Sequence, residues 1–238
     1  LGDVYKRQEA ITLEQSKLTL SKDITVLSFS DSSMVDRNSS IIKVDSGWIV
    51  YSKNSESSIL SFTSDGQFSG YIGHRGNGPG EYTSVYDVVV NQKSKVLEVL
   101  SDGGIFCYTF GGDFLDKKEV TYPAFSFAID DRQNYWFYVG NNTTYGDAKM
   151  ICTDENIANV AYYLHQKSNM LPMVENNFGR NGEWLTFHES LNHDLYTIEN
   201  GKLDLSYAMD FPNYKLPKKL HELSGMEVIE ELQRSNSV

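Results

Sequence analysis

One supersecondary pattern returns through this sequence about every 45 residues. Each copy contains short strands of alternating apolar residues and a tight turn built around glycine. The turn glycines are Gly66, Gly112 and Gly201, and Asn156 stands at the third of the four positions, because asparagine often replaces glycine where φ is positive. A period of roughly 40 to 50 residues with several strands per period is typical of β-propellers. The repeat therefore predicts an all-β chain made of propeller blades.

The strands between the turns predict four blades, each a four-stranded antiparallel sheet. One extra strand, residues 24–29, precedes them, and propellers commonly close their ring by pairing such a strand with the last blade. The blades with this strand occupy residues 24–212, and the four blades lie at about residues 41–73, 85–120, 123–165 and 177–211.

The two ends of the chain lie outside the repeat. Residues 1–23 show neither strand alternation nor a helical stripe, and we expect them to be disordered or foreign to the fold. Residues 213–238 allow two interpretations, a weakly amphipathic helix or the start of a truncated blade. The helix is favoured by apolar residues at three-residue steps: Leu220, Leu223, Met226, Ile229 and Leu232. Because the repeat stops after Phe211, a fragment of a longer propeller is favoured over a complete four-bladed one.

Composition and charge exclude some functions. The formal net charge of −11 argues against nucleic acid as a partner, because that affinity depends on Lys and Arg neutralising phosphates. No apolar run approaches the roughly 18 residues of a membrane span, so no transmembrane segment is predicted. No export signal is visible in this chain.

The two cysteines, Cys107 and Cys152, are 45 residues apart and so belong to the same strand of successive blades. Neighbouring blades pack about 10 Å apart, which is beyond the roughly 7 Å Cα separation that a disulfide allows. Two free, mostly buried thiols are predicted.

The glycine-rich stretch at residues 73–82, GHRGNGPGEY, could suggest a phosphate-binding loop. A P-loop needs Gly-Lys-Ser/Thr at the start of a helix, and a dinucleotide fingerprint also leads into a helix. Strands are predicted on both sides of this stretch, so we interpret it as a connector between two blades.

This connector, followed by the strand Val85–Val90, resembles that of NHL-like six-bladed β-propellers. It is particularly similar to uncharacterised six-bladed propeller proteins and lipoproteins of gut Bacteroidetes, and the segment Tyr207–Phe211 is similar to the same family. The resemblance covers about residues 24–220. It implies that four of six blades are present, that the protein is exported to the periplasm or cell surface, and that its role is binding or scaffolding.

No catalytic constellation or metal site stands out among the five histidines. His188 and His193 flank Glu189, but their spacing of five residues is not that of a zinc-binding H-E-x-x-H motif. We therefore predict no catalytic residue, no metal and no cofactor.

A ligand is expected on the face formed by the blade-to-blade connectors and the loops between second and third strands. Aromatic and amide groups beside a few charges suit a glycan, a peptide or a partner protein. The candidate binding residues on these loops are His74, Arg75, Glu81, Tyr82, Asn141, Asn142, Tyr145, Arg180 and His188.

Three functions fit these observations. The favoured one is a non-enzymatic binding or scaffold propeller with its ligand on the loop face. The second is an NHL-type lyase or hydrolase with a site at the channel mouth, where only His74 and His188 fall in suitable loops. The third is a purely structural interaction domain.

Overall fold

The computed structural model describes residues 23–28, 35, 39–53, 58–140, 146–165, 176–182, 184–189, 192–209, 222–223 and 226–234. Over these residues the chain forms four antiparallel four-stranded sheets and one two-stranded pair. In every four-stranded sheet the strands are neighbours in chain order, as in a propeller blade. The predicted all-β propeller with four blades is confirmed.

The blades have the following strands. The first blade contains β1 (Ser40–Val44), β2 (Gly47–Tyr51), β3 (Ile59–Thr63) and β4 (Phe68–Ile72). The second contains β7 (Asp87–Asn91), β8 (Val96–Ser101), β9 (Gly104–Tyr108) and β10 (Phe114–Lys118). The third contains β11 (Ser126–Ile129), β12 (Tyr135–Tyr138), β13 (Ala148–Thr153) and β14 (Ala161–His165). The fourth contains β15 (Phe178–Asn181), β16 (Trp184–His188), β17 (Asp194–Glu199) and β18 (Lys202–Ala208).

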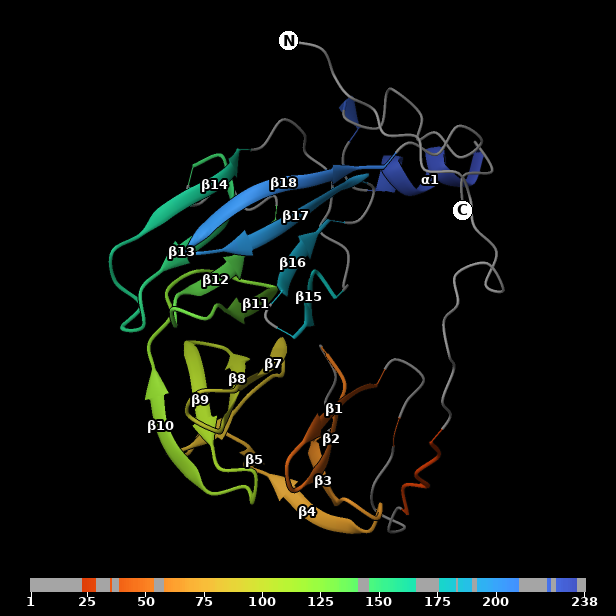
Figure 1. Ribbon diagram of the computed structural model, residues 1–238, viewed down its shortest axis with the longest axis vertical. Coiled ribbons are helices and arrows are strands. Elements are labelled where there is room, and N and C mark those ends of the chain that lie inside the picture. Colours follow the sequence, from red (N-terminus) through yellow and green to blue (C-terminus); the bar gives the residue numbers. More distant parts are fainter. Residues whose placement is uncertain are drawn as a thin grey trace.

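The four blades follow one another around a centre, and the first strand of each blade is innermost (Figure 1). The inner strands are β1, β7, β11 and β15, with β7 contacting β11 and β11 contacting β15. Because strands in a blade are antiparallel, connectors and second-to-third loops lie on one side, called here the connector face. The first-to-second and third-to-fourth turns lie on the opposite side, called the turn face.

Apolar side chains between adjacent blades form the core. Since strand residues alternate between two faces, each blade packs one face on its predecessor and the other on its successor. Ile49 and Tyr51 of the first blade pack with Leu97 of the second, and Trp136 of the third packs with Phe187 of the fourth. Trp136 and Phe187 are completely buried. The fold is thus stabilised by blade-on-blade packing.

The turn between third and fourth strands recurs, with one difference from the sequence prediction. Gly66 and Gly112 have φ of 90° and 100°, and each donates its N–H to the carbonyl three residues earlier. In the third blade this contact is made by Ile157, at φ 58°, and not by Asn156, which has no positive φ. The assignment of Asn156 was therefore wrong by one residue. The Asp154 carboxylate accepts backbone N–H groups within the turn, and this bonding holds a β-branched residue in a conformation that it rarely adopts.

The segment before the first blade is not the strand predicted at residues 24–29. Residues 23–28 form no strand, and a single parallel bridge joins Ser28 to Gln67, with the Ser28 N–H bonded to the Gly66 carbonyl at 2.8 Å. Leu27 packs on the first blade, whereas Ile24 and Val26 are exposed. Because Ile24 and Val26 bury little apolar surface, forming a regular strand here would add little stability. Residues 1–22 of the predicted tail, and Phe29, lie outside the described residues.

Near the C-terminus the structure has one helix, α1 (Met226–Arg234), whose Val228 and Leu232 are buried. Glu227 lies in its first turn and Arg234 in its last, which suits the helix dipole. Residues 210–221 lie outside the described part of the chain. Among the described residues, no helix combines the length and the apolar character needed to cross a membrane.

Both cysteines are free and buried, Cys107 on β9 and Cys152 on β13, the third strands of successive blades. The sequence prediction is confirmed. Burial raises the pKa of each thiol to about 12.

Neither thiol is therefore expected to react in the folded protein. We expect Ellman's reagent to modify no cysteine near neutral pH under native conditions and two after denaturation, because only an accessible thiolate attacks. The released chromophore measures both values. Rapid reaction of the native protein would contradict the buried placement.

Candidate functional site: two connected cavities

A cavity of about 370 Å³, called here the axial cavity, lies between the inner strands of all four blades. Its walls are largely apolar, with Val88 of β7, Phe127 of β11 and Phe178 of β15 among them. Polar groups stand where the inner strands meet the connector face, namely Ser40, Tyr51, Lys53, Asp87, Asn176 and Asn177. The propeller thus brings together residues that are distant in sequence.

A second cavity of about 490 Å³, the turn-face cavity, is lined by turns of the second, third and fourth blades. Its polar residues include Lys93, Asp131, Gln133, Glu199 and Asn200. Both volumes are within the roughly 300–1,000 Å³ of small-molecule sites. The two cavities share the lining residues Val90, Gln92, Ile129, Arg180 and Leu185, so they meet inside the ring.

A buried ion pair closes one side of the axial cavity. Lys53 Nζ lies 2.9 Å from Asp87 Oδ1, with side chains only 9% and 8% exposed. The N–H of Phe127 donates to Asp87 Oδ2 at 3.1 Å, and the N–H of Val88 donates to Oδ1 at 3.0 Å. Burial raises the pKa of Asp87, while the Lys53 ammonium and these N–H groups oppose the rise. Asp87 of the second blade is thus bonded to the first and the third.

An amide performs the same bridging between the third and fourth blades. Ser126 Oγ donates to Asn177 Oδ1 at 2.9 Å, and Asn177 Nδ2 donates to the His188 carbonyl at 3.2 Å. The N–H of His188 returns a bond to the Asn177 carbonyl at 2.9 Å. His188 is held here through its backbone, and its side chain is exposed.

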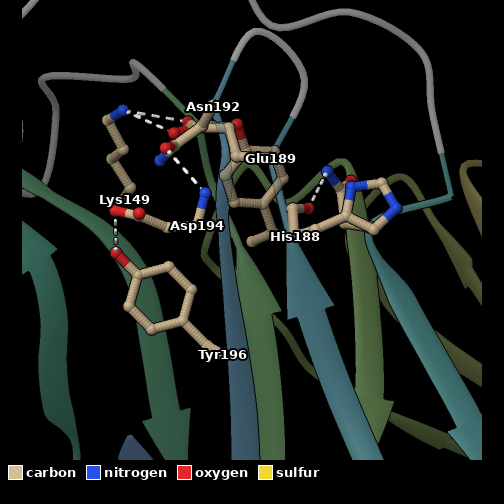
Figure 2. Close-up of polar contacts among 8 residues, drawn as sticks. Lys149, His188, Glu189, Asn192, Asp194 and Tyr196 are labelled. Carbon is tan, nitrogen blue, oxygen red and sulfur yellow. Dashed lines mark hydrogen bonds and ion pairs between the residues drawn. The ribbon is translucent and has the colours of Figure 1, made fainter. Parts of the chain in front are cut away.

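A second buried ion pair follows β16. Lys149 Nζ donates to both oxygens of Glu189, at 2.9 and 2.8 Å, and the Tyr138 hydroxyl donates to Oε1 at 2.7 Å. Figure 2 shows Lys149 bonded to Glu189, with Asp194 and Tyr196 beside them. Sequence reasoning treated Glu189 only as a residue between histidines. A lysine inside the apolar third strand of the third blade was the signal that a buried carboxylate lies nearby.

The glycine-rich stretch is the connector between the first and second blades, and it contains the short parallel pair β5 (His74–Arg75) and β6 (Glu81–Tyr82). Glu81 accepts the N–H of Gly78 at 2.8 Å. A Cβ at Gly76 would lie 2.0 Å from the Glu81 carboxylate, so a side chain at this position would displace that carboxylate. The backbone N–H of Gly78 is thus bonded to a carboxylate and that of Gly76 to the Tyr82 carbonyl, so neither is available to a phosphate.

Most predicted binding residues have structural roles or lie apart. Arg75 Nε donates to the Thr83 carbonyl at 2.9 Å, and His74 is exposed on the same connector. Tyr82 is completely buried, so its side chain offers no surface to a ligand in this structure. Asn141, Asn142 and Tyr145 lie outside the described residues.

Arg180 is the predicted residue that lines both cavities. It does not stand on the connector face with His188, because antiparallel pairing places it opposite Leu185, toward the turn face. Those members of the predicted set that the structure describes thus do not form one cluster. Among the described residues, no three His, Cys, Asp or Glu side chains are grouped to hold a metal ion.

Replacing Tyr82 with phenylalanine tests its structural role. Its hydroxyl donates to the Ile72 carbonyl at 3.2 Å and accepts the N–H of Ile59 at 3.3 Å, so the substitution leaves buried backbone groups without this partner. We expect a loss of about 1–3 kcal/mol in unfolding free energy, measured by urea titration. Unchanged stability would contradict this role.

One protein-family model covers nearly the whole chain. The family model described as "Domain of unknown function (DUF4934)" matches residues 4–236. This chain belongs to that family. No curated protein matches the chain.

Two solved structures share the fold of this DUF4934 chain. The exported protein BF0058 from Bacteroides fragilis has a TM-score of 0.71 at 15% identity, covering 82% of this chain and 56% of its own. A member of the DUF4221 family from Bacteroides vulgatus has a TM-score of 0.55 at 10% identity, covering 91% of this chain and 70% of its own. The chain thus spans little more than half the length of the B. fragilis protein. At these identities the likeness concerns the fold.

Proposed function

We propose that this chain is the ligand-binding part of an exported bacterial propeller that holds its ligand without converting it. The observation that carries this proposal is the axial cavity, because inner strands of all four blades line it and it shares lining residues with a second cavity. Apolar walls with a few placed polar groups are typical of small-molecule sites.

The proposed ligand is a glycan, a peptide or an exposed segment of a protein, and the proposed place is the cavity rather than the connector face. Arg75, Glu81 and Tyr82 hold the connector itself, which leaves that part of the connector face with few groups to offer a ligand. We further propose an extracytoplasmic location and a complete ring of six NHL-like blades. The B. fragilis protein, which is described as exported and of which this chain covers 56%, supports the location and a longer propeller. The number six rests on the resemblance of the connector at residues 73–82 to that of NHL-like propellers.

The buried ionisable groups favour binding over catalysis. Asp87 is paired with Lys53, and Glu189 with Lys149, at 2.9 and 2.8 Å. A general acid or base needs a proton that it can exchange with a substrate, and these groups are instead committed to one another and to backbone N–H groups.

The test is a titration of the chain with panels of neutral and acidic oligosaccharides and of short peptides, followed by calorimetry, with mass spectrometry of each ligand afterwards. We expect saturable binding of a ligand that is recovered unchanged. Val90→Phe narrows the junction of the cavities and should abolish binding, whereas the control Val160→Phe, outside both cavities, should not. Conversion of the ligand would replace this proposal with an enzyme, and the absence of saturable binding would overturn it.

A further inference from the structure

The charges that line the axial cavity do not cancel. Two cations, Lys53 and Arg180, face one carboxylate, Asp87. Lys53 is bonded to Asp87 at 2.9 Å, so these two compensate each other. Arg180 remains as the uncompensated charge of this cavity, in a chain whose formal net charge is −11. Arg180 is exposed to solvent, and an accessible positive group in an acidic protein favours an anion at that point.

Arg180 stands where an anion could reach it from both cavities. Its guanidinium donates one hydrogen bond, to the Ile129 carbonyl of the third blade, and this is its one hydrogen bond to the part of the chain that the structure describes. Arginine carries five N–H donors in a planar fork. One bond to a carbonyl anchors the fork and leaves donors for a bidentate pair with a carboxylate.

Apolar side chains stand beside Arg180. Val90, Ile129 and Leu185 line the same junction, and Ile129 and Leu185 are buried. Arg180 itself is exposed, so solvent screens its charge, and the apolar walls add contact area for the rest of a ligand held there. Inorganic anions would leave these apolar walls without a partner, whereas an organic acid would contact both.

The residues that line the turn-face cavity indicate which other groups the ligand carries. It contains the carboxylates Asp130, Asp131 and Glu199. Asp130 is occupied, because it accepts the backbone N–H of Arg132 and of Asn134 and the indole N–H of Trp136. Asp131 and Glu199 are exposed acceptors that suit hydroxyl or amine donors. A ligand with its carboxylate at Arg180 would extend toward them with such donors.

We propose that Arg180 anchors a small organic carboxylate in the axial cavity, with the donor groups of that ligand directed to Asp131 and Glu199. The inference rests on the proposed binding function and adds the chemical class of the ligand. Two sources carry this chemistry: an acidic sugar and the free C-terminus of a short peptide.

The test compares each acid with its neutral counterpart by calorimetry. The probes are digalacturonate against its methyl ester and trialanine against trialanine amide. We expect one acid to bind and its neutral counterpart to bind at least about tenfold more weakly, with affinity falling as salt is raised. The acid that binds identifies the source.

Variants assign the effect to Arg180. Arg180→Gln should weaken binding of the acid at least about tenfold, and Arg180→Lys should recover only part of it, because lysine keeps the charge but loses the fork. Arg75→Gln is the matched control, since Arg75 also donates to a backbone carbonyl but lies on the connector. Thermal unfolding of each variant separates lost binding from lost folding, and Arg180→Lys covers the case in which Arg180→Gln does not fold.

Three results would overturn the inference: equal affinity for the neutral counterpart, full affinity in Arg180→Gln, or failure of both acids to bind. Binding of a neutral ligand that Val90→Phe abolishes would remove the anion site while leaving the binding function in place. Failure of every probe and of the wider panels would remove both.

Discussion

Replacing Asp87 with alanine is expected to lower the unfolding free energy by about 3–5 kcal/mol. The substitution removes the carboxylate that lies 2.9 Å from the Lys53 ammonium, which is 9% exposed, and it removes the acceptor of the Phe127 N–H on the next blade. Removing one member of a buried ion pair costs more than the pair itself contributes, because the desolvation of the remaining charge is offset less. The contacts that are lost join the second blade to the first and to the third.

The measurement is urea unfolding followed by circular dichroism, with a double-mutant cycle. Lys53→Met alone should also destabilise, and the double variant Lys53→Met/Asp87→Ala should be more stable than Asp87→Ala, since it buries neither charge of the pair. Full recovery is not expected, because the Phe127 N–H still loses its acceptor. A change within about 0.5 kcal/mol for Asp87→Ala would show that the pair does not stabilise the fold.

Replacing Glu189 with alanine is expected to have a similar effect, a loss of about 3–5 kcal/mol. Lys149, 12% exposed, would lose both of its charge-assisted bonds, and the Tyr138 hydroxyl would lose its acceptor. The third and fourth blades would then be joined mainly by apolar packing around Trp136 and Phe187.

An exposed pair supplies the control for Glu189. Asp45 and Lys95 are 3.0 Å apart but 79% and 54% exposed, and such pairs contribute about 0–1 kcal/mol. Asp45→Ala should therefore leave the unfolding midpoint nearly unchanged while Glu189→Ala lowers it strongly. Equal effects of the two substitutions would mean that burial of the Lys149–Glu189 pair is not what makes it strong.

Much of the architecture followed from features that lie within a few residues of one another. The alternation of apolar residues and the turn glycines predicted four blades, and the 45-residue separation of Cys107 and Cys152 predicted their place on equivalent strands. The errors were also local. Asn156 was chosen by residue type, whereas the Asp154 side chain allows Ile157 to take the left-handed position.

The candidate site was much less accessible to sequence reasoning. Loop membership selected Tyr82, which is buried, and grouped Arg180 with His188, although pairing in the fourth blade places them toward opposite faces. Asp87 and Glu189 were not selected at all. Their partners Lys53 and Lys149 are 34 and 40 residues away, so the position of Lys149 inside an apolar strand could indicate a buried carboxylate but not which one.

By itself, the sequence determined the fold class, the number of blades in this chain and the connector between the first two, because strand alternation and turn geometry depend on neighbouring residues. Only the tertiary structure decided which charges form buried pairs and which charges line a cavity. Closing blades around an axis brings Lys53 to Asp87 and leaves Arg180 between two cavities. That outcome depends on how whole sheets pack against one another, and burial in that packing sets the strength of every charge it encloses.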